Sequence, residues 1–117
     1  MFKDSGKHVL LYRDLDPAEV KEILDNKNGT RLIDVREEWE HKIAGIEDSE
    51  LMPLSNFMKH IEDLNEDDEI IFYCHRGVRS ANVCTFLAGK GYKNLINLKG
   101  GIEAWSNEID PSIPHYE

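Results

Sequence analysis

The chain has 117 residues, enough for one domain with one hydrophobic core and too few for two. Its 14 basic and 23 acidic side chains give a net charge of −9, which excludes nucleic-acid binding because no basic stripe exists to displace counterions. No apolar run approaches the roughly 20 residues of a membrane-spanning helix, and residues 1–7 lack a secretory signal. Two cysteines are too few for the disulfide framework of a secreted scaffold, so we expect a cytoplasmic domain. Because it has no membrane-spanning run, we also expect no membrane binding.

The first part of the chain predicts a strand, a helix and a second strand. Val9–Tyr12 is a short apolar run that predicts a strand. Asp16–Glu19 combines a capping box with a proline at the first helical position, so a helix is expected from Pro17 to the break at Asn28–Gly29. Arg31–Arg36 predicts the next strand, with polar residues at its carboxyl end.

Shorter elements follow the second strand. Glu37–His41 predicts a helical turn, and Leu51–Met52 predicts a third short strand that Pro53 closes. Ser55 is expected to cap the next helix. The apolar stripe of that helix consists of Phe57, Met58, Ile61 and Leu64.

The second half of the chain places a cysteine between a buried strand and a helix. Ile70–Tyr73 is apolar throughout, as expected of a strand that is buried on both faces. Cys74 follows directly, a short loop comes next, and Ser80–Ala88 has the apolar spacing of a helix. Asn94–Leu98 predicts the last strand, and Ile102–Asn107 predicts the last helix.

Strands alternate with helices along the chain, which predicts an α/β domain with a mostly parallel central sheet. In such folds, ligands bind outside the carboxyl ends of the strands. Asp34–Arg36 and the loop after Cys74 both lie at such ends. We therefore expect the functional site there.

The loop after Cys74 has the composition of an anion cradle around a reactive thiol. A free cysteine titrates near pH ~8.5, and cationic neighbours or a helix N-terminus lower that value. The backbone N–H groups of His75–Arg79 are expected to face the sulfur, with Gly77 supplying a backbone angle that a side chain disfavours. Arg76 and Arg79 are expected to hold an anionic substrate. The pattern predicts attack by a Cys74 thiolate on an oxyanion-bearing substrate.

The other cysteine and the histidines receive no catalytic assignment. Cys84 lies in mid-helix among apolar residues and is expected to fill the core, although a Cys74–Cys84 redox pair stays open. His75 is either a surface residue of the loop or a general base, because adjacency in sequence does not fix the direction of its ring. No histidine pair has metal-ligand spacing, so we expect neither a metal nor a cofactor.

Four segments, in order, resemble those of single-domain rhodaneses, which are thiosulfate-type sulfurtransferases. They are Asp34–Glu37, Ile43–Gly45 with Met52–Leu54, Tyr73–Ser80, and Leu98–Trp105. Glu108–Tyr116 is similar to the rhodanese domains attached to enzymes that activate ubiquitin-like sulfur carriers. The resemblance covers nearly the whole chain and implies a single rhodanese-like domain over residues 1–117, with three layers and a mostly parallel sheet flanked by helices.

The resemblance also implies a mechanism. Cys74 takes the outer sulfur of thiosulfate or a related sulfane donor, becomes a persulfide, and passes the sulfur to cyanide or to a protein acceptor, either a ubiquitin-like sulfur carrier or a thioredoxin-like thiol. The residues implied to bind the substrate and hold the persulfide are His75, Arg76, Gly77, Val78, Arg79 and Ser80. By family analogy Asp34 and Arg36 brace the site, with a surface salt bridge as the alternative. Many relatives carry a Gly-His pair where this chain has His41–Gly45, so His41 is left out of the site.

Two other functions stay open. One is a sulfur-relay or binding module with little free turnover. The other is a cysteine-dependent phosphatase or arsenate reductase, since related folds carry out that chemistry. Those enzymes have five residues between the cysteine and the arginine, whereas Cys74 and Arg79 enclose four. The shorter loop favours a sulfur substituent over a tetrahedral oxyanion.

Overall fold

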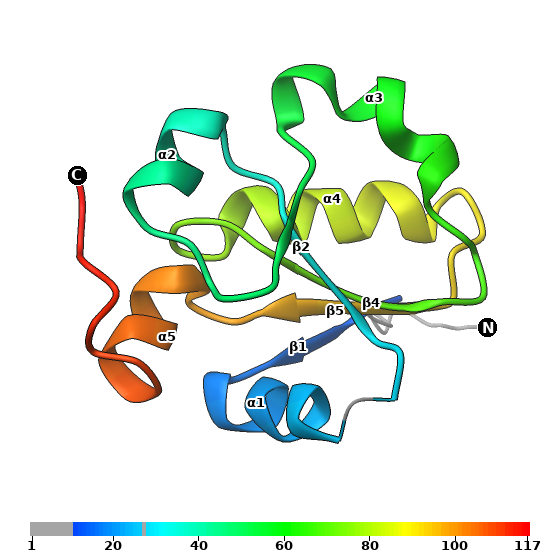
Figure 1. Cartoon of the computed structure of the whole chain (residues 1–117). Coiled ribbons are helices and arrows are strands. Elements are labelled where there is room, and N and C mark those ends of the chain that lie inside the picture. Colours follow the sequence, from blue (N-terminus) through cyan, green and yellow to red (C-terminus); the bar gives the residue numbers. More distant parts are fainter. Residues whose placement is uncertain (1–10, 27) are drawn as a thin grey trace, which may run out of the picture.

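The structure is a computed structural model that describes residues 11–26 and 28–117. Its centre is a five-stranded sheet in which all neighbouring strands are parallel (Figure 1). In spatial order, the strands are β1 (Arg13–Leu15), β5 (Asn94–Leu98), β4 (Glu69–Tyr73), β2 (Arg31–Asp34) and β3 (Glu50–Leu51). The predicted α/β class is confirmed.

Helices cover both faces of this sheet. They are α1 (Pro17–Asp25), α2 (Glu38–Ile43), α3 (Phe57–His60), α4 (Val78–Ala88) and α5 (Gly101–Glu108), with the 3-10 turns η1 (Leu54–Asn56) and η2 (Ile61–Asp63). On one face, Leu87 of α4 shares a buried cluster with Phe72. On the other face, Val20 of α1 and Ile102 of α5 share a buried cluster with Ile71. Successive residues of β4 thus point to opposite faces, and the expected three layers are confirmed. Within the described ranges, no helix combines the length and apolar character needed to cross a membrane.

The first strand differs from its prediction. Residues 9–10 lie outside the described residues, and Leu11 and Tyr12 precede the strand rather than form it. The strand is Arg13–Leu15, which pairs with Ile96–Leu98 of β5. Backbone hydrogen bonding to β5 decides where the strand lies, whereas an apolar run carries no information about a partner strand.

The helix predicted after Ser55 is broken into short turns. Ser55 lies inside η1, and its backbone N–H and hydroxyl donate to the Glu37 carboxylate at 3.1 and 2.6 Å, so the prediction that it caps the helix is wrong. Met58 is 60% exposed, which contradicts its place in the apolar stripe, whereas Phe57 and Leu64 are buried. One α-helical turn between two 3-10 turns does not keep the 3.6-residue period on which that stripe depends.

The remaining elements follow their sequence signals closely. The capping box is formed, since Asp16 Oδ1 accepts from the Glu19 N–H at 2.9 Å and Glu19 Oε1 accepts from the Asp16 N–H at 3.1 Å. α4 begins at Val78 rather than at Ser80, because Gly77 adopts a left-handed conformation with φ of 99° and ends the loop. Ser80 therefore lies in the first turn of α4.

Candidate active site

Cys74 follows the carboxyl end of β4, near the middle of the sheet, and is 1% exposed. The carbonyl groups of Cys74 and His75 accept the backbone N–H groups of Ile102 and Glu103 at 2.9 and 3.1 Å. These bonds hold the first turn of α5 against the loop. Gly101, with φ of 64°, permits the close approach, because a Cβ atom there would collide with the His75 carbonyl oxygen. The N-termini of α4 and α5 therefore both adjoin the loop that carries this thiol, as expected for a site at strand ends.

Three donors of the loop and of α4 face the Cys74 sulfur. The Gly77 N–H is 3.1 Å from Sγ, the Ser80 N–H is 3.4 Å from it, and the Ser80 hydroxyl is 3.3 Å from it. The two N–H groups belong to the N-terminal end of α4, where the helix dipole is positive. This arrangement, which we call the sulfur cradle (Cys74–Ser80), favours a thiolate or another anionic sulfur at Cys74.

Ser80 also begins a buried polar chain that the sequence analysis missed. Its hydroxyl is 2.5 Å from Asn97 Oδ1, and Asn97 Nδ2 donates to Asp14 Oδ1 at 2.9 Å and to the Gly77 carbonyl at 3.3 Å. Because a carboxylate and a carbonyl only accept, Asn97 presents Oδ1 to Ser80, and the hydroxyl donates its proton there. The thiol of Cys74 can then donate to Ser80 Oγ, and on ionisation the hydroxyl can turn to the sulfur. In the sequence, the available signal for this polar chain was Asn97 itself, a polar side chain inside the apolar last strand.

The Arg79 guanidinium is paired with a carboxylate. Its two Nη atoms donate to the two Oε atoms of Glu40, each at 2.8 Å. Burial raises the pKa of Glu40, but hydrogen bonds from Arg79 and Tyr116 outweigh burial and lower this pKa to about 2. The hydrogen bonds to Glu40 raise the pKa of Arg79 in turn. Both groups stay charged and compensate each other. No local pattern in the sequence indicated Glu40, which lies 39 positions before its partner.

Asp34 and Arg36 form a second ion pair, which is fully buried. Arg36 donates through Nε and Nη2 to the two Asp34 oxygens at 2.9 and 2.7 Å. The alternative of a surface salt bridge is therefore wrong. Arg36 also donates to the Ala44 carbonyl and to the Tyr116 hydroxyl, and the Nδ1 atom of His41 is 2.8 Å from Asp34 Oδ2. The pair connects the end of β2 to α2 and to the C-terminal tail.

The ring of His75 lies against the tail and α5. It stacks on Tyr116 with the ring centroids 4.1 Å apart, and its Nε2 atom is 3.4 Å from Glu103 Oε1. Burial and the nearby Arg76 lower the pKa of His75, so the ring is neutral at physiological pH. Arg76 is an exposed residue whose Nε atom is 3.4 Å from both Glu103 oxygens. Val78 is exposed at the first position of α4. Of the predicted cradle, Gly77 and Ser80 thus contact the sulfur.

Tyr116 connects the parts of the site that the sequence keeps apart. Its hydroxyl donates to Glu40 Oε2 at 2.6 Å and accepts from Arg36 Nη1 at 2.9 Å, while its ring covers His75. Figure 1 shows the tail, in red, running from α5 toward α2 and ending beside it. We call Asp34, Arg36, Glu40, Arg79 and Tyr116 the charged cluster.

Cys84 is buried in α4, in the same apolar cluster as Cys74. Burial raises the pKa of Cys84 to about 12, with smaller contributions from Asp14 and Cys74. The residue therefore stays a thiol and fills the core, as predicted, and both cysteines are free.

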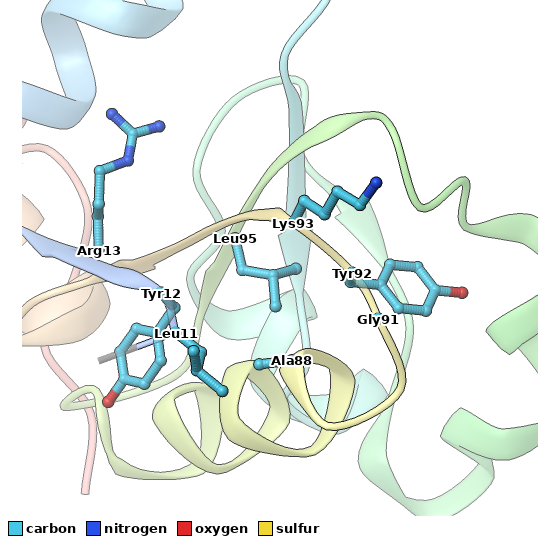
Figure 2. Close-up of a pocket in the computed structure, with 8 residues that line it drawn as sticks. All are labelled: Leu11, Tyr12, Arg13, Ala88, Gly91, Tyr92, Lys93 and Leu95. Carbon is cyan, nitrogen blue, oxygen red and sulfur yellow. The ribbon is translucent and has the colours of Figure 1, made fainter. Parts of the chain in front are cut away.

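A cavity of about 590 Å³ lies at the C-terminal end of α4 (Figure 2). It is lined by Leu11, Tyr12, Arg13, Ala88, Gly91, Tyr92, Lys93 and Leu95. Ala88 ends α4, whereas the sulfur cradle contacts the start of that helix. An eleven-residue helix is about 16 Å long, so this cavity belongs to another part of the surface.

Comparisons with known proteins agree with this geometry. The sequence model of the family described as "Rhodanese-like domain" matches residues 16–108. The probable adenylyltransferase/sulfurtransferase MoeZ of Mycobacterium tuberculosis is 33% identical over 104 residues, which are 87% of this chain and 26% of MoeZ. The chain thus spans about a quarter of that relative. The putative sulfurtransferase YtwF of Bacillus subtilis is 33% identical over 99 residues, which are 85% of this chain and 95% of YtwF.

The fold is also similar to that of solved structures. The crystal structure of a rhodanese-related protein from Thermoplasma volcanium matches with a TM-score of 0.74 and 31% sequence identity. The match covers 84% of this chain and 94% of that protein. The family model, the relative and the solved structure each match most of the chain, and the protein therefore belongs to the family of rhodanese-like domains.

Proposed function

We propose that this protein is a sulfurtransferase that moves a sulfane sulfur from thiosulfate or a related donor to a thiophilic acceptor through a persulfide on Cys74. The observation that carries the proposal is the convergence of the Gly77 N–H, the Ser80 N–H and the Ser80 hydroxyl on one buried sulfur. Such donors stabilise an anionic sulfur, and both the thiolate and the persulfide are anions. The names of MoeZ and YtwF, which both include sulfurtransferase, support the reaction class.

The proposed reaction has two displacements. The Cys74 thiolate attacks the outer sulfur of the donor, the new S–S bond forms, and the donor's own bond to that sulfur breaks. The leaving group departs with the electron pair, as sulfite when the donor is thiosulfate. An acceptor, cyanide or a protein thiol, then attacks the terminal sulfur and regenerates the Cys74 thiolate.

The other predicted site residues have supporting roles in this proposal. The loop from His75 to Ser80 presents the Gly77 and Ser80 N–H groups to the sulfur, and Asp34 with Arg36 braces the strand end that adjoins it. A cytoplasmic location suits the chemistry, because a reducing compartment keeps Cys74 as a thiol. The proposed acceptor is a protein, a ubiquitin-like sulfur carrier or a thioredoxin-like thiol, since the name of MoeZ joins sulfur transfer to adenylyl transfer.

Mass spectrometry of the intact protein tests this proposal. We expect a mass gain of one sulfur after incubation with thiosulfate or with an organic persulfide, and none for Cys74→Ser. Cys84→Ala is the matched control, and it should gain sulfur as the wild type does. The proposal fails if the wild type gains no sulfur on Cys74 from any sulfane donor.

Turnover assays distinguish the alternative functions. Fast transfer to a protein acceptor with slow transfer to cyanide would identify a relay module. Hydrolysis of an aryl phosphate that depends on Cys74 would identify a phosphatase, and we expect none.

A further inference from the structure

We infer that the site selects organic or protein persulfides over thiosulfate as the sulfur donor, and that Glu40 is the residue that sets this preference. The inference rests on the proposed function and names its donor class. Among the described residues, it follows from which groups pair with the positive charges around Cys74. Thiosulfate is a dianion, and its sulfonate oxygens need donors or cations beyond those that hold the transferred sulfur.

The two arginines that are anchored beside the loop carry no free charge. Arg79 donates both of its hydrogen bonds to Glu40 at 2.8 Å. Arg36 is fully buried and paired with Asp34 at 2.7 Å. Each pair is neutral as a whole, and a carboxylate beside a guanidinium repels an approaching sulfonate while the guanidinium attracts it. The net attraction for a dianion is therefore small.

Glu40 is held so firmly that a small anion cannot displace it from Arg79. The residue is buried, and each of its carboxylate oxygens accepts two hydrogen bonds. Oε1 accepts from Arg79 and from the Glu37 N–H at 3.1 Å, and Oε2 accepts from Arg79 and from the Tyr116 hydroxyl at 2.6 Å. All four acceptor positions of the carboxylate are thus used. Tyr116 completes this set and acts here as a positioning residue.

Among the residues that the structure describes, the other cations near the loop are exposed or neutral. Arg76 is 60% exposed in its side chain and lies beside Glu103. Arg76 and the exposed Lys99 border an open cavity of about 300 Å³ together with Asp14, and solvent screens charges in such a position. The ring of His75 is neutral because its pKa is lowered. The overall charge of −9 also opposes the approach of a dianion.

The groups that face the sulfur suit a persulfide donor. The Gly77 N–H, the Ser80 N–H and the Ser80 hydroxyl converge on Sγ itself, where the transferred sulfur will be bonded. With a donor R–S–SH, the Cys74 thiolate attacks the outer sulfur, the new S–S bond forms, and the thiolate R–S⁻ leaves with the electron pair. The proton of the outer sulfur passes to R–S⁻ to give R–SH. No sulfonate has to be bound at any stage.

The rate of persulfide formation on Cys74 from two donors, thiosulfate and glutathione persulfide, tests this inference. For the wild type, we expect kcat/KM with glutathione persulfide to be roughly 10- to 100-fold higher than with thiosulfate. This factor corresponds to the charge-assisted contacts that the sulfonate of thiosulfate lacks in this site. In Glu40→Gln, Arg79 gains a free positive charge, so the ratio should move roughly tenfold toward thiosulfate, through a lower KM for that donor.

Glu38→Gln is the matched control, because it removes the same charge from an exposed position of the same helix. It should leave the ratio unchanged. Tyr116→Phe removes one hydrogen bond to Glu40 and should shift the ratio in the same direction as Glu40→Gln, by a smaller factor. This variant tests the inference if Glu40→Gln does not fold. A wild type that prefers thiosulfate, or an equal shift in Glu38→Gln, overturns the inference. Absence of any Cys74 persulfide would instead overturn the proposed function.

Discussion

The sulfur cradle and the charged cluster lie side by side and are built in different ways. The cradle is local: its sulfur and its three donors come from seven consecutive residues, and backbone groups supply two of the donors. The charged cluster joins three distant parts of the chain, namely the segment with Asp34, Arg36 and Glu40, then Arg79, and then Tyr116. The cradle presents polar groups to a reacting atom, whereas the cluster satisfies its charges internally. We therefore expect changes in the cluster to act on stability and on the choice of sulfur donor, and changes in the cradle to act on the rate of sulfur transfer itself.

The largest expected effect on stability comes from Asp34→Asn. This change leaves the charge of Arg36 buried without a carboxylate, and we expect the free energy of unfolding to fall by about 3–5 kcal/mol. Urea denaturation measures it. Asp25→Asn is the control, because Asp25 forms an exposed pair with Lys21 and should cost less than about 0.5 kcal/mol. Equal losses of unfolding free energy in Asp34→Asn and Asp25→Asn would contradict the importance of the buried ion pair for stability.

Acid should remove the contribution of Glu40. Its folded-state pKa is lowered from 4.5 to about 2, so its stabilisation is complete above the unfolded value and is lost as the pH falls toward 2. We expect the difference in unfolding free energy between the wild type and Glu40→Gln to shrink by roughly 3 kcal/mol from pH 6 to pH 2. Denaturation at a series of pH values measures this difference. A difference that does not change with pH would refute the assignment.

Gly77→Ala tests the cradle. The left-handed φ of 99° disfavours alanine, and a Cβ atom would lie 3.1 Å from the Gly100 nitrogen, so the N–H that faces the sulfur should move. We expect persulfide formation to slow by on the order of 100-fold. Gly29→Ala is the matched control: it has φ of 85° with no atom within 4 Å of the new Cβ, and should keep the wild-type rate. A slow Gly29→Ala would show that backbone strain alone is responsible.

The smallest of these effects is expected for Ser80→Ala. This variant loses the hydroxyl that faces the sulfur and leaves Asn97 Oδ1 without its partner. We expect persulfide formation to slow by roughly 10-fold, because the reacting sulfur loses a hydrogen-bond donor. Thr85→Ala, in the same helix, should leave the rate unchanged, since the Thr85 hydroxyl donates to the Ala81 carbonyl and not to the sulfur. An unchanged rate in Ser80→Ala would exclude the polar chain from the chemistry.

The sequence by itself determined the alternation of strands and helices, the capping box at Asp16, the last strand and the place of Cys74 at a strand end. These features depend on side-chain periodicity and on residues within a few positions of one another. The sulfur cradle belongs to this group, because its donors are near neighbours of Cys74 in the chain and a glycine fixes the turn.

The tertiary structure alone decided the partners of the charged residues. Arg79 was expected to hold an anion, and only the packing of α2 beside α4 gives it Glu40. Asn97 meets Ser80, and Tyr116 meets Glu40 and His75, because the order of the strands and the path of the tail bring them together. The positions of β1 and Met58 likewise depend on a strand partner and on a broken helix. Hydrogen bonds between residues tens of positions apart leave no local pattern, so the charge state around the thiol followed from the fold and not from the motif.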